Sequence, residues 1–251
     1  MLIPCCVFKG ETVIWYVELD MQLTSLINRM KRRALRFRLR PIRVFCFHQV
    51  SNEFEPETMK KCDWMQTDAF KQSVFALKKR YTFISLPEVS CHLKYDRFRV
   101  KRYAALTSDD GWASLKNVLP WLDEQNVPVT LFLNPCYMDG KHYREKDTEK
   151  YLSMEEVLCY GMQYKDLTVA LHGWEHKDVS ALSNLEFRND VEQSFKALSV
   201  FPCFVPFFAY PWGRHNDNND AVLFEYGMTP VLMDGMVNYT DPFFIHREML
   251  K

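Results

Sequence analysis

From residue 44 onward, short apolar runs alternate with amphipathic stretches, and this alternation constrains the fold more than any other sequence feature. Strands are predicted at 44–47, 81–86, 103–106, 129–133, 167–171, 204–210, 230–233 and 243–245. Helices are predicted at 68–80, 113–125, 154–159, 185–198 and 221–226. Strands that alternate with helices form a parallel sheet with helices on its faces. About seven such units in one continuous chain favour an α/β barrel over an open sheet.

The domain organisation follows from length and charge. A chain of 251 residues can form one large or two small domains. Residues 44–251 contain no internal repeat, low-complexity segment or linker, so we expect one domain there. Residues 1–43 carry nine basic and three acidic side chains in a molecule of zero net charge. They are expected to form a basic N-terminal extension, while the zero net charge gives no reason to expect binding to nucleic acid.

Cysteine usage and the N-terminal sequence predict a cytoplasmic protein. The eight cysteines include no C-x-x-C pair, and several lie in apolar runs, which is typical of reduced, buried thiols. Charged residues interrupt the first twenty positions, so they do not read as a signal peptide. No run reaches the length of a membrane-spanning helix.

Two adjacent carboxylates follow the apolar run at 103–106. The sequence T-S-D-D-G at 107–111 leads from this strand into Asp109, Asp110 and a glycine turn. In a β/α barrel, the C-terminal ends of the strands face the active site. Two carboxylates in a confined site need a shared proton or cation, and a metal on one would leave the other as a base. An exposed Asp-Asp-Gly turn is the alternative.

Two histidines, His172 and His176, follow the apolar run at 167–171. Their spacing lets both imidazoles reach one ion if the residues between them turn helically. Together with one aspartate they would form a three-ligand site that leaves positions for water and substrate. Two histidines and one carboxylate accept Zn, Fe, Co or Ni, so the ligand types alone do not identify the metal.

Together these segments resemble the polysaccharide deacetylase family (NodB-homology proteins, carbohydrate esterase family 4). T-S-D-D-G at 107–111 resembles the family's T-F-D-D-G motif, with Ser108 in place of the aromatic residue. H-G-W-E-H at 172–176 resembles H-(S/T)-x-x-H, with Gly173 in place of the hydroxyl residue. F-A-Y-P-W-G at 208–213 resembles the R-x-P-Y-G motif, and F-H-Q-V at 47–50 resembles a Y-H-x-V opening of the first strand. The four matches occur in order and cover residues 44–251.

The resemblance implies a distorted, NodB-like (β/α)7 barrel that removes acetyl groups from an N-acetylated sugar or polysaccharide with one divalent metal, most often zinc. The implied metal ligands are Asp110, His172 and His176, and the implied general base is Asp109. Such a metal would polarise the acetamide carbonyl and acidify water, and Asp109 could accept the proton. A backbone N–H in the turn formed by Pro211, Trp212 and Gly213 would help to hold the oxyanion.

Two departures from the family pattern concern the catalytic residues. Ala209 replaces the arginine of the third motif, and Arg247 is expected to supply the guanidinium from the last strand. His246 matches the position of the family's general acid. Adjacent strand residues face opposite sides, so we predict that Arg247 contacts Asp109 and that His246 points away from the metal. The acid then stays unassigned, and His48 is a candidate either for a role in the pocket or for a purely structural one.

Two other functions stay open. H-G-W-E-H at 172–176 also fits the H-x-x-E-H signature of inverted zinc peptidases. That signature needs a helix, which Gly173 after a strand disfavours, and it leaves Asp109 and Asp110 unexplained. The second alternative is a catalytically weak, sugar-binding barrel, in which the missing arginine marks lost activity.

The basic segment Arg29–Arg43 has eight cations in fifteen residues. Met30, Leu35 and Leu39 in this segment, together with Ile27 just before it, could form an apolar side. Such a helix could be solvated, or it could lie on the anionic inner face of a membrane, where each cation contributes about 1 kcal/mol. Membrane contact would suit an enzyme that acts on lipid-linked sugars.

Overall fold

The computed structural model describes residues 40–54, 63–96, 98–138 and 150–251. The described residues within 41–96 and 101–251 form one compact unit, whereas Arg40 and Phe98–Val100 belong to a second unit. Of the predicted extension 1–43 and its basic segment, all but residues 40–43 lie outside the described residues. Among the described helices, none combines the length and the apolar character needed to cross a membrane.

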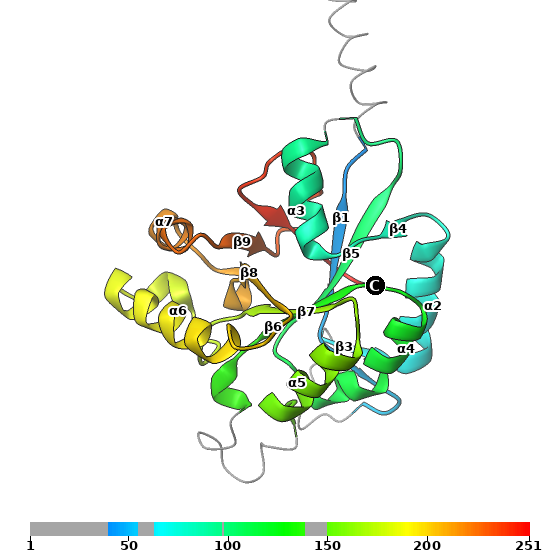
Figure 1. Cartoon of the computed structure of the whole chain (residues 1–251), viewed down its shortest axis with the longest axis horizontal. Helices are drawn as coiled ribbons and strands as arrows, with labels where there is room; N and C mark the ends of the chain where they lie inside the picture. Colours follow the sequence, from blue (N-terminus) through cyan, green and yellow to red (C-terminus); the bar gives the residue numbers. More distant parts are fainter. Residues whose placement is uncertain (1–39, 55–62, 97, 139–149) are drawn as a thin grey trace, which may run out of the picture. The chain divides into compact units, whose positions relative to one another are not determined.

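A set of parallel strands forms the centre of the main unit (Figure 1). These are β1 (Arg43–Phe47), β5 (Tyr103–Ser108), β6 (Val129–Leu133), β7 (Leu167–Leu171), β8 (Phe204–Ala209), β9 (Thr229–Leu232), β10 (Ile245–His246) and β11 (Glu248–Met249). Their order in the sheet is β10-β9-β8-β7-β6-β5-β1-β11. A short strand, β4 (Thr82–Phe83), also pairs with β5.

The last segment of the chain closes this sheet into a barrel. Only Arg247 separates β10, which pairs with β9, from β11, which pairs with β1. The Arg247 amide also donates to Leu232 O at the end of β9, at 2.8 Å. One continuous segment therefore pairs with both ends of the sheet. Counted as one strand, it gives seven parallel barrel strands, and the predicted (β/α)7 architecture is confirmed.

Helices surround the strands (Figure 1). They are α2 (Thr67–Lys78), α3 (Leu86–Tyr95), α4 (Leu119–Glu124), α5 (Met154–Gln163), α6 (Asn184–Leu198) and α7 (Asp217–Glu225). Short 3₁₀ turns add η1 (Ala113–Asn117), η2 (Pro135–Tyr137), η3 (Val179–Ala181) and η4 (Pro211–Gly213). Capping boxes begin α3, α5, α6 and α7, because a side chain at each N-cap accepts a backbone N–H from the first turn.

Two predicted elements and one small sheet differ from the sequence expectations. The strand predicted at 81–86 ends at Phe83, because Ser85 and Glu88 form a capping box that begins α3. The helix predicted at 113–125 divides into η1 and α4, with Pro120 in the first turn of α4. A two-stranded parallel sheet, β2 (Gln49–Ser51) with β3 (Trp64–Gln66), was not predicted.

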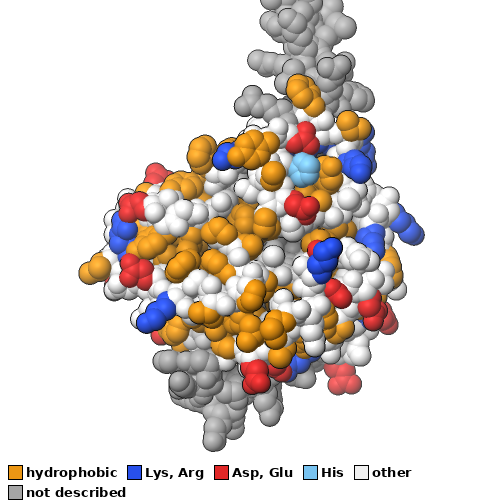
Figure 2. Space-filling model, in the orientation of Figure 1, with side chains coloured by type: hydrophobic (Ala, Val, Ile, Leu, Met, Phe, Trp, Pro, Cys, Tyr) orange, Lys and Arg blue, Asp and Glu red, His pale blue; other side chains and the backbone are white. Residues whose placement is uncertain are grey.

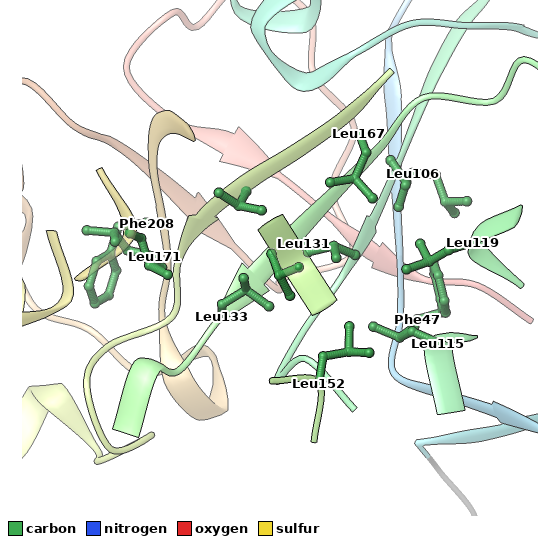
Figure 3. Close-up of a cluster of buried hydrophobic side chains, with 14 of the residues drawn as sticks. Phe47, Leu106, Leu115, Leu119, Leu131, Leu133, Leu152, Leu167, Leu171 and Phe208 are labelled. Atoms are coloured by element: carbon green, nitrogen blue, oxygen red, sulfur yellow. The ribbon is translucent and has the colours of Figure 1, made fainter. Parts of the chain in front are cut away.

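Buried apolar side chains lie on both faces of the barrel strands. The larger cluster packs the outer face against the helices, and part of it is drawn in Figure 3, including Leu106, Leu131 and Leu171. A second cluster combines inward-facing strand residues such as Ala105 and Ala170 with residues of α3. On the surface shown in Figure 2, acidic and basic side chains are interspersed among hydrophobic ones.

The strand pleat determines which polar residues reach the barrel interior. Successive side chains on a strand face opposite sides. Along β5, Ala104 and Leu106 belong to the outer cluster and Ala105 to the inner one. Asp109 is four residues after Ala105, so it continues the inward-facing series past the end of the strand. The same alternation places Arg247 inward after Ile245 on the last strand.

Candidate metal centre

Three predicted ligands meet at the C-terminal ends of β5 and β7. Asp110 Oδ1 lies 3.4 Å from His172 Nε2 and 3.3 Å from His176 Nε2. The three ligand atoms all lie within 4.8 Å of one another. Two donors that each lie about 2.0–2.1 Å from a tetrahedral ion are roughly 3.3 Å apart. The donor spacing therefore fits one small divalent ion.

The charges of these groups also favour a cation. Burial would raise the pKa of Asp110, but His172 and His176 outweigh it and lower that pKa, so the carboxylate is ionised at neutral pH. Burial, together with His172, lowers the pKa of His176 to about 4, which keeps this imidazole neutral. Asp110 Oδ1 is buried and has no hydrogen-bond partner among the described residues. A buried acceptor without a donor is costly, and a metal ion would satisfy it.

Backbone geometry at the two ligand segments is unusual. Asp110 has φ 72° and His176 has φ 53°, both in the left-handed region that side chains other than glycine rarely adopt. Gly111 and Gly173 also have positive φ, of 74° and 77°. The segment after His172 is not helical, so the two imidazoles meet through an irregular loop and not through the helical turn considered from the sequence. Such strain is concentrated at functional sites.

Three side chains, two at or in η2 and one on α6, hold the loop at 172–176. Asn134 Nδ2 donates to His172 O and Gly173 O, and Tyr137 Oη donates to Glu175 O at 2.7 Å. The Asp190 carboxylate on α6 accepts the Trp174 amide at 3.0 and 3.1 Å. These contacts fix the direction in which His176 projects.

A hydrogen bond to the backbone sets the tautomer of His172. Its Nδ1 lies 2.8 Å from Ala209 O. Because a carbonyl oxygen only accepts, Nδ1 carries a hydrogen, and Nε2 is the nitrogen that faces Asp110 and can bind a metal. Ala209 stands where the resembling motif has an arginine, and its carbonyl orients the imidazole of His172.

Asp109 is paired with Arg247, as the sequence predicted. Arg247 Nη1 donates to Asp109 Oδ1 at 2.7 Å and Nη2 donates to Oδ2 at 2.9 Å. Both side chains are almost fully buried. Burial alone would raise the pKa of Asp109, but Arg247 and then His172 outweigh it, and the pKa lies well below its usual range. The Asp109 carboxylate is therefore ionised, and its Oδ2 is 3.9 Å from His172 Nε2.

A second group of possible ligands surrounds Asp109. Cys46, His48 and Asp109 also place one ligand atom each within 4.8 Å of one another. Arg247 already supplies a positive charge there, since its Nη1 lies 3.5 Å from Cys46 Sγ and 2.7 Å from Asp109. Burial, with Asp109, also raises the pKa of Cys46, which keeps the thiol protonated. The Asp110 group is the better cation site.

His246 does not belong to this site, which corrects its inclusion among the catalytic candidates. Its Nδ1 lies 2.6 Å from Asp234 Oδ2, and its side chain is not part of the cavity lining. Its neighbour Arg247 points inward, so the strand alternation turns His246 to the opposite side. The last strand therefore supplies the arginine and not the general acid.

The turn at 211–213 lies beside the metal centre. Trp212 has φ 60°, and its ring packs edge-on against His176 with centroids 4.8 Å apart. Pro211 has no amide hydrogen, and the Gly213 amide donates to Tyr210 O at 2.9 Å. Trp212 and Gly213 of this predicted oxyanion turn line the cavity, and the Gly213 amide already has an acceptor within the fold.

A cavity of about 380 Å³ opens over these groups. His48 lines it, with Nε2 4.0 Å from Asp109 Oδ2. Much of the remaining wall was not predicted and consists of Gln49, Asp63, Trp112, Tyr137, Tyr151, Tyr210, Met233 and Met249. Tyr137 and Tyr151 flank residues 139–149 and match no motif. The aromatic content of 15% was the one sequence signal for such a wall.

Comparisons with known proteins agree with this geometry. A family model described as polysaccharide deacetylase matches residues 98–231. No curated protein matches the chain. Among solved structures, the chain is similar to IcaB from Ammonifex degensii, with a TM-score of 0.72 and 20% identity over 84% of this chain and 92% of that one.

Two further solved structures have the same fold. The deacetylase PplD from Streptococcus pyogenes, in complex with acetate, has a TM-score of 0.69 and 19% identity over 84% of this chain and 92% of that one. A de-N-acetylase from Aggregatibacter actinomycetemcomitans has a TM-score of 0.68 and 15% identity over 83% of this chain and 94% of that one. At these identities the similarity concerns the fold.

Proposed function

Because the chain belongs to the polysaccharide deacetylase family, we propose that Asp109 and the Asp110–His172–His176 centre hydrolyse the acetamide of an N-acetylated sugar polymer. Enzymes of this family are hydrolases that remove acetyl groups from carbohydrate nitrogen. The observation that carries the assignment to these residues is the pair of adjacent aspartates with different partners. Asp110 faces two imidazoles, whereas Asp109 is held by a guanidinium.

The reaction needs an activated water, a polarised carbonyl and a proton acceptor. A divalent ion held by Asp110, His172 and His176 would polarise the acetamide carbonyl and acidify water. Asp109 accepts the proton of the attacking water, because it stays ionised and lies next to the ligand set. Its partner Arg247 holds the carboxylate in one orientation through two hydrogen bonds.

The developing oxyanion and the leaving amine need further groups. In this proposal a backbone N–H of the turn at 211–213 donates to the oxyanion, since Trp212 and Gly213 line the cavity. His48 lines the cavity beside Asp109 and can deliver a proton to the leaving nitrogen. His48 would thus act as the general acid in place of His246, whose side chain points away from the cavity.

The two alternative functions have less support. The peptidase signature requires His172 and His176 on a helix, but the segment is an irregular loop. Its Glu175 forms an ion pair with Lys177 at 2.5 Å and is not part of the cavity lining. The weak sugar-binding barrel rested on the missing arginine, and Arg247 now occupies that role beside Asp109.

We propose zinc as the resident ion. Two imidazole nitrogens and one carboxylate oxygen, with donors spaced for a tetrahedral site, suit Zn²⁺ and leave a position for substrate. Contact with a membrane through Arg29–Arg43, action on lipid-linked sugars and a cytoplasmic location are further proposals. The membrane and lipid proposals rest on the sequence of Arg29–Arg43, which lies almost wholly outside the described residues, and the cytoplasmic location rests on the cysteine usage and the N-terminal sequence.

The activity can be tested by measuring acetate released from N-acetylglucosamine oligomers of increasing length and from a lipid-linked N-acetyl sugar. We expect acetate from at least one of these substrates with the native protein and none with Asp109→Ala. Binding of the oligomers without acetate release would support the sugar-binding barrel instead. Cleavage of a casein substrate that depends on Glu175 would support the peptidase.

A further inference from the structure

We infer that Trp112 is a positioning residue that selects which oxygen of Asp110 can bind the metal. Its indole Nε1 donates a hydrogen bond to Asp110 Oδ2 at 2.9 Å. The other oxygen, Oδ1, is the one that faces His172 and His176. The inference rests on the proposed metal centre and assigns it a residue outside the ligand set.

The two oxygens of Asp110 have different environments. Oδ1 is buried without a hydrogen-bond partner among the described residues, whereas Oδ2 accepts the indole N–H. A free carboxylate can bind an ion through one oxygen or through both. A donor fixed on Oδ2 occupies one of them, so Asp110 would bind through Oδ1 alone. The site then keeps positions for water and the acetamide oxygen.

The backbone and the ring of Trp112 are both fixed. Hydrogen bonds on either side of it join Ala113 N to Lys150 O at 2.7 Å and Leu152 N to Gly111 O at 2.8 Å. The indole stacks on Tyr151, with centroids 4.7 Å apart and planes at 24°. The flanking backbone hydrogen bonds and the stacking on Tyr151 already hold the indole in place. Trp112 can therefore orient the carboxylate with little further loss of its own side-chain entropy when the metal binds.

The chemistry of the indole suits this task. An indole N–H is uncharged and only donates, so it cannot itself compete for the metal. The left-handed backbone of Asp110, with φ 72°, directs its side chain away from the usual strand direction. The indole contact helps to hold the carboxylate in that position.

Two substitutions distinguish the effect of the indole N–H donor from the effect of the aromatic ring. Trp112→Phe keeps an aromatic ring on Tyr151 but removes the N–H. Trp112→Gln removes the ring but keeps an N–H donor at a similar reach from the backbone. Trp64→Phe is the matched control, because Trp64 Nε1 also donates a hydrogen bond, to Ser51 Oγ at 2.8 Å, outside the cavity.

The readout is Co²⁺ binding by the metal-stripped protein, followed by visible absorption and by competition with a chelator. Trp112→Phe should weaken binding by about 10-fold or more, the usual cost of losing a group that supports a ligand. Its spectrum should also change, since Oδ2 is released to coordinate. Trp112→Gln and Trp64→Phe should stay within about threefold of the native affinity.

Native affinity and an unchanged spectrum in Trp112→Phe would overturn the inference. Should that variant not fold, Trp112→Gln decides, because weak binding in a folded Gln variant would show that the ring matters and not the donor. Asp110→Ala distinguishes the two proposals. If native protein and Asp110→Ala bind Co²⁺ equally, the proposed centre itself is wrong, whatever Trp112 does.

Discussion

The contrast between Asp109 and Asp110 shows how neighbouring identical residues acquire different chemistry. The pleat turns Asp109 toward the barrel interior, where Arg247 meets it. The left-handed backbone at Asp110 turns the next carboxylate toward the two histidines. The sequence alone left open which aspartate binds a metal, and the family resemblance suggested the assignment. The contacts now give a physical reason for it.

The division of labour between the aspartates can be measured. Asp109→Asn should abolish acetate release while bound metal stays near one per chain, because the change removes a base and not a ligand. Asp110→Asn should lose both activity and metal, since an amide oxygen is a weak ligand for Zn²⁺. Metal content by elemental analysis and acetate release are measured on the same preparations. Equal metal loss in both variants would contradict these roles.

The Arg247 contact predicts a kinetic signature. Arg247→Ala should lower kcat by about 100-fold or more with little change in KM, because its task is to orient Asp109 and not to bind substrate. Removing the guanidinium also leaves Asp109 buried without its partner, at a cost of about 3–5 kcal/mol in stability. Thermal unfolding must therefore accompany the kinetics.

Arg247→Lys is the matched variant for this test. Lysine keeps the positive charge but cannot make both hydrogen bonds to Asp109. Its kcat should fall between those of the native protein and Arg247→Ala. A full kcat in a folded Arg247→Ala would show that Asp109 needs no partner.

At the scale of elements, the segment formed by β10, Arg247 and β11 both closes the barrel and contributes a residue to the candidate site. The same five residues pair with β9 and β1 and carry Arg247, the partner of Asp109, into the interior. The sequence indicated that Arg247 and His246 would face opposite ways, because that follows from strand geometry. It did not predict β11, because a two-residue strand is too short to give a periodic pattern.

The helix α3 offers a stability test away from the site. Ser85 accepts the Glu88 amide while the Glu88 side chain accepts the Ser85 amide, and the apolar face of α3 packs on the inner cluster of the barrel. Ser85→Ala should lower the free energy of unfolding by about 1 kcal/mol without changing metal affinity. Chemical denaturation measures this directly. Ser90→Ala, inside the same helix, is the control and should cost nothing, since alanine is the better helix former.

This helix was missed although its signal was present in the sequence. S-L-P-E at 85–88 is a capping-box pattern with a proline in the first turn. The apolar run at 81–86 led to the prediction of a strand instead, because a run of that length is typical of a buried strand. To predict this helix, the capping box and the helical spacing of the apolar residues after it have to be considered together.

For the whole molecule, the alternation of strands and helices was sufficient to predict the barrel, and the motif residues gave most of the site. His48, Asp109, Asp110, His172, His176 and two residues of the turn at 211–213, Trp212 and Gly213, all line one cavity. The aromatic wall from Tyr137 and Tyr151 could not be predicted. Those two rings contact each other although they are well separated in the sequence, and no local pattern encodes the contact.

One buried carboxylate predicts how stability depends on pH. Burial raises the pKa of Asp190 to about 6, and its ordinary value is 3.8. Between these two values the folded chain holds a proton that the unfolded chain has lost. The contribution of Asp190 is therefore complete below about pH 4 and is lost as the pH rises through 6.

Asp190→Asn should remove this dependence, because asparagine does not titrate and its side-chain oxygen can still accept the Trp174 amide. In metal-free protein, the free energy of unfolding of the variant minus that of the native protein should rise by roughly 1–3 kcal/mol from pH 4 to pH 7. Urea unfolding at several pH values provides the measurement. Parallel pH profiles for the two proteins would show that Asp190 has an ordinary pKa.

The central claim is that one divalent ion on Asp110, His172 and His176 is required for deacetylation. The most direct test is acetate release from an N-acetylglucosamine oligomer by chelator-stripped protein as Zn²⁺ is added back. The account predicts activity that is near zero at first, rises linearly and reaches its plateau at one equivalent of zinc, with no recovery in Asp110→Ala. Full activity in the stripped protein, or equal recovery in Asp110→Ala, would contradict it.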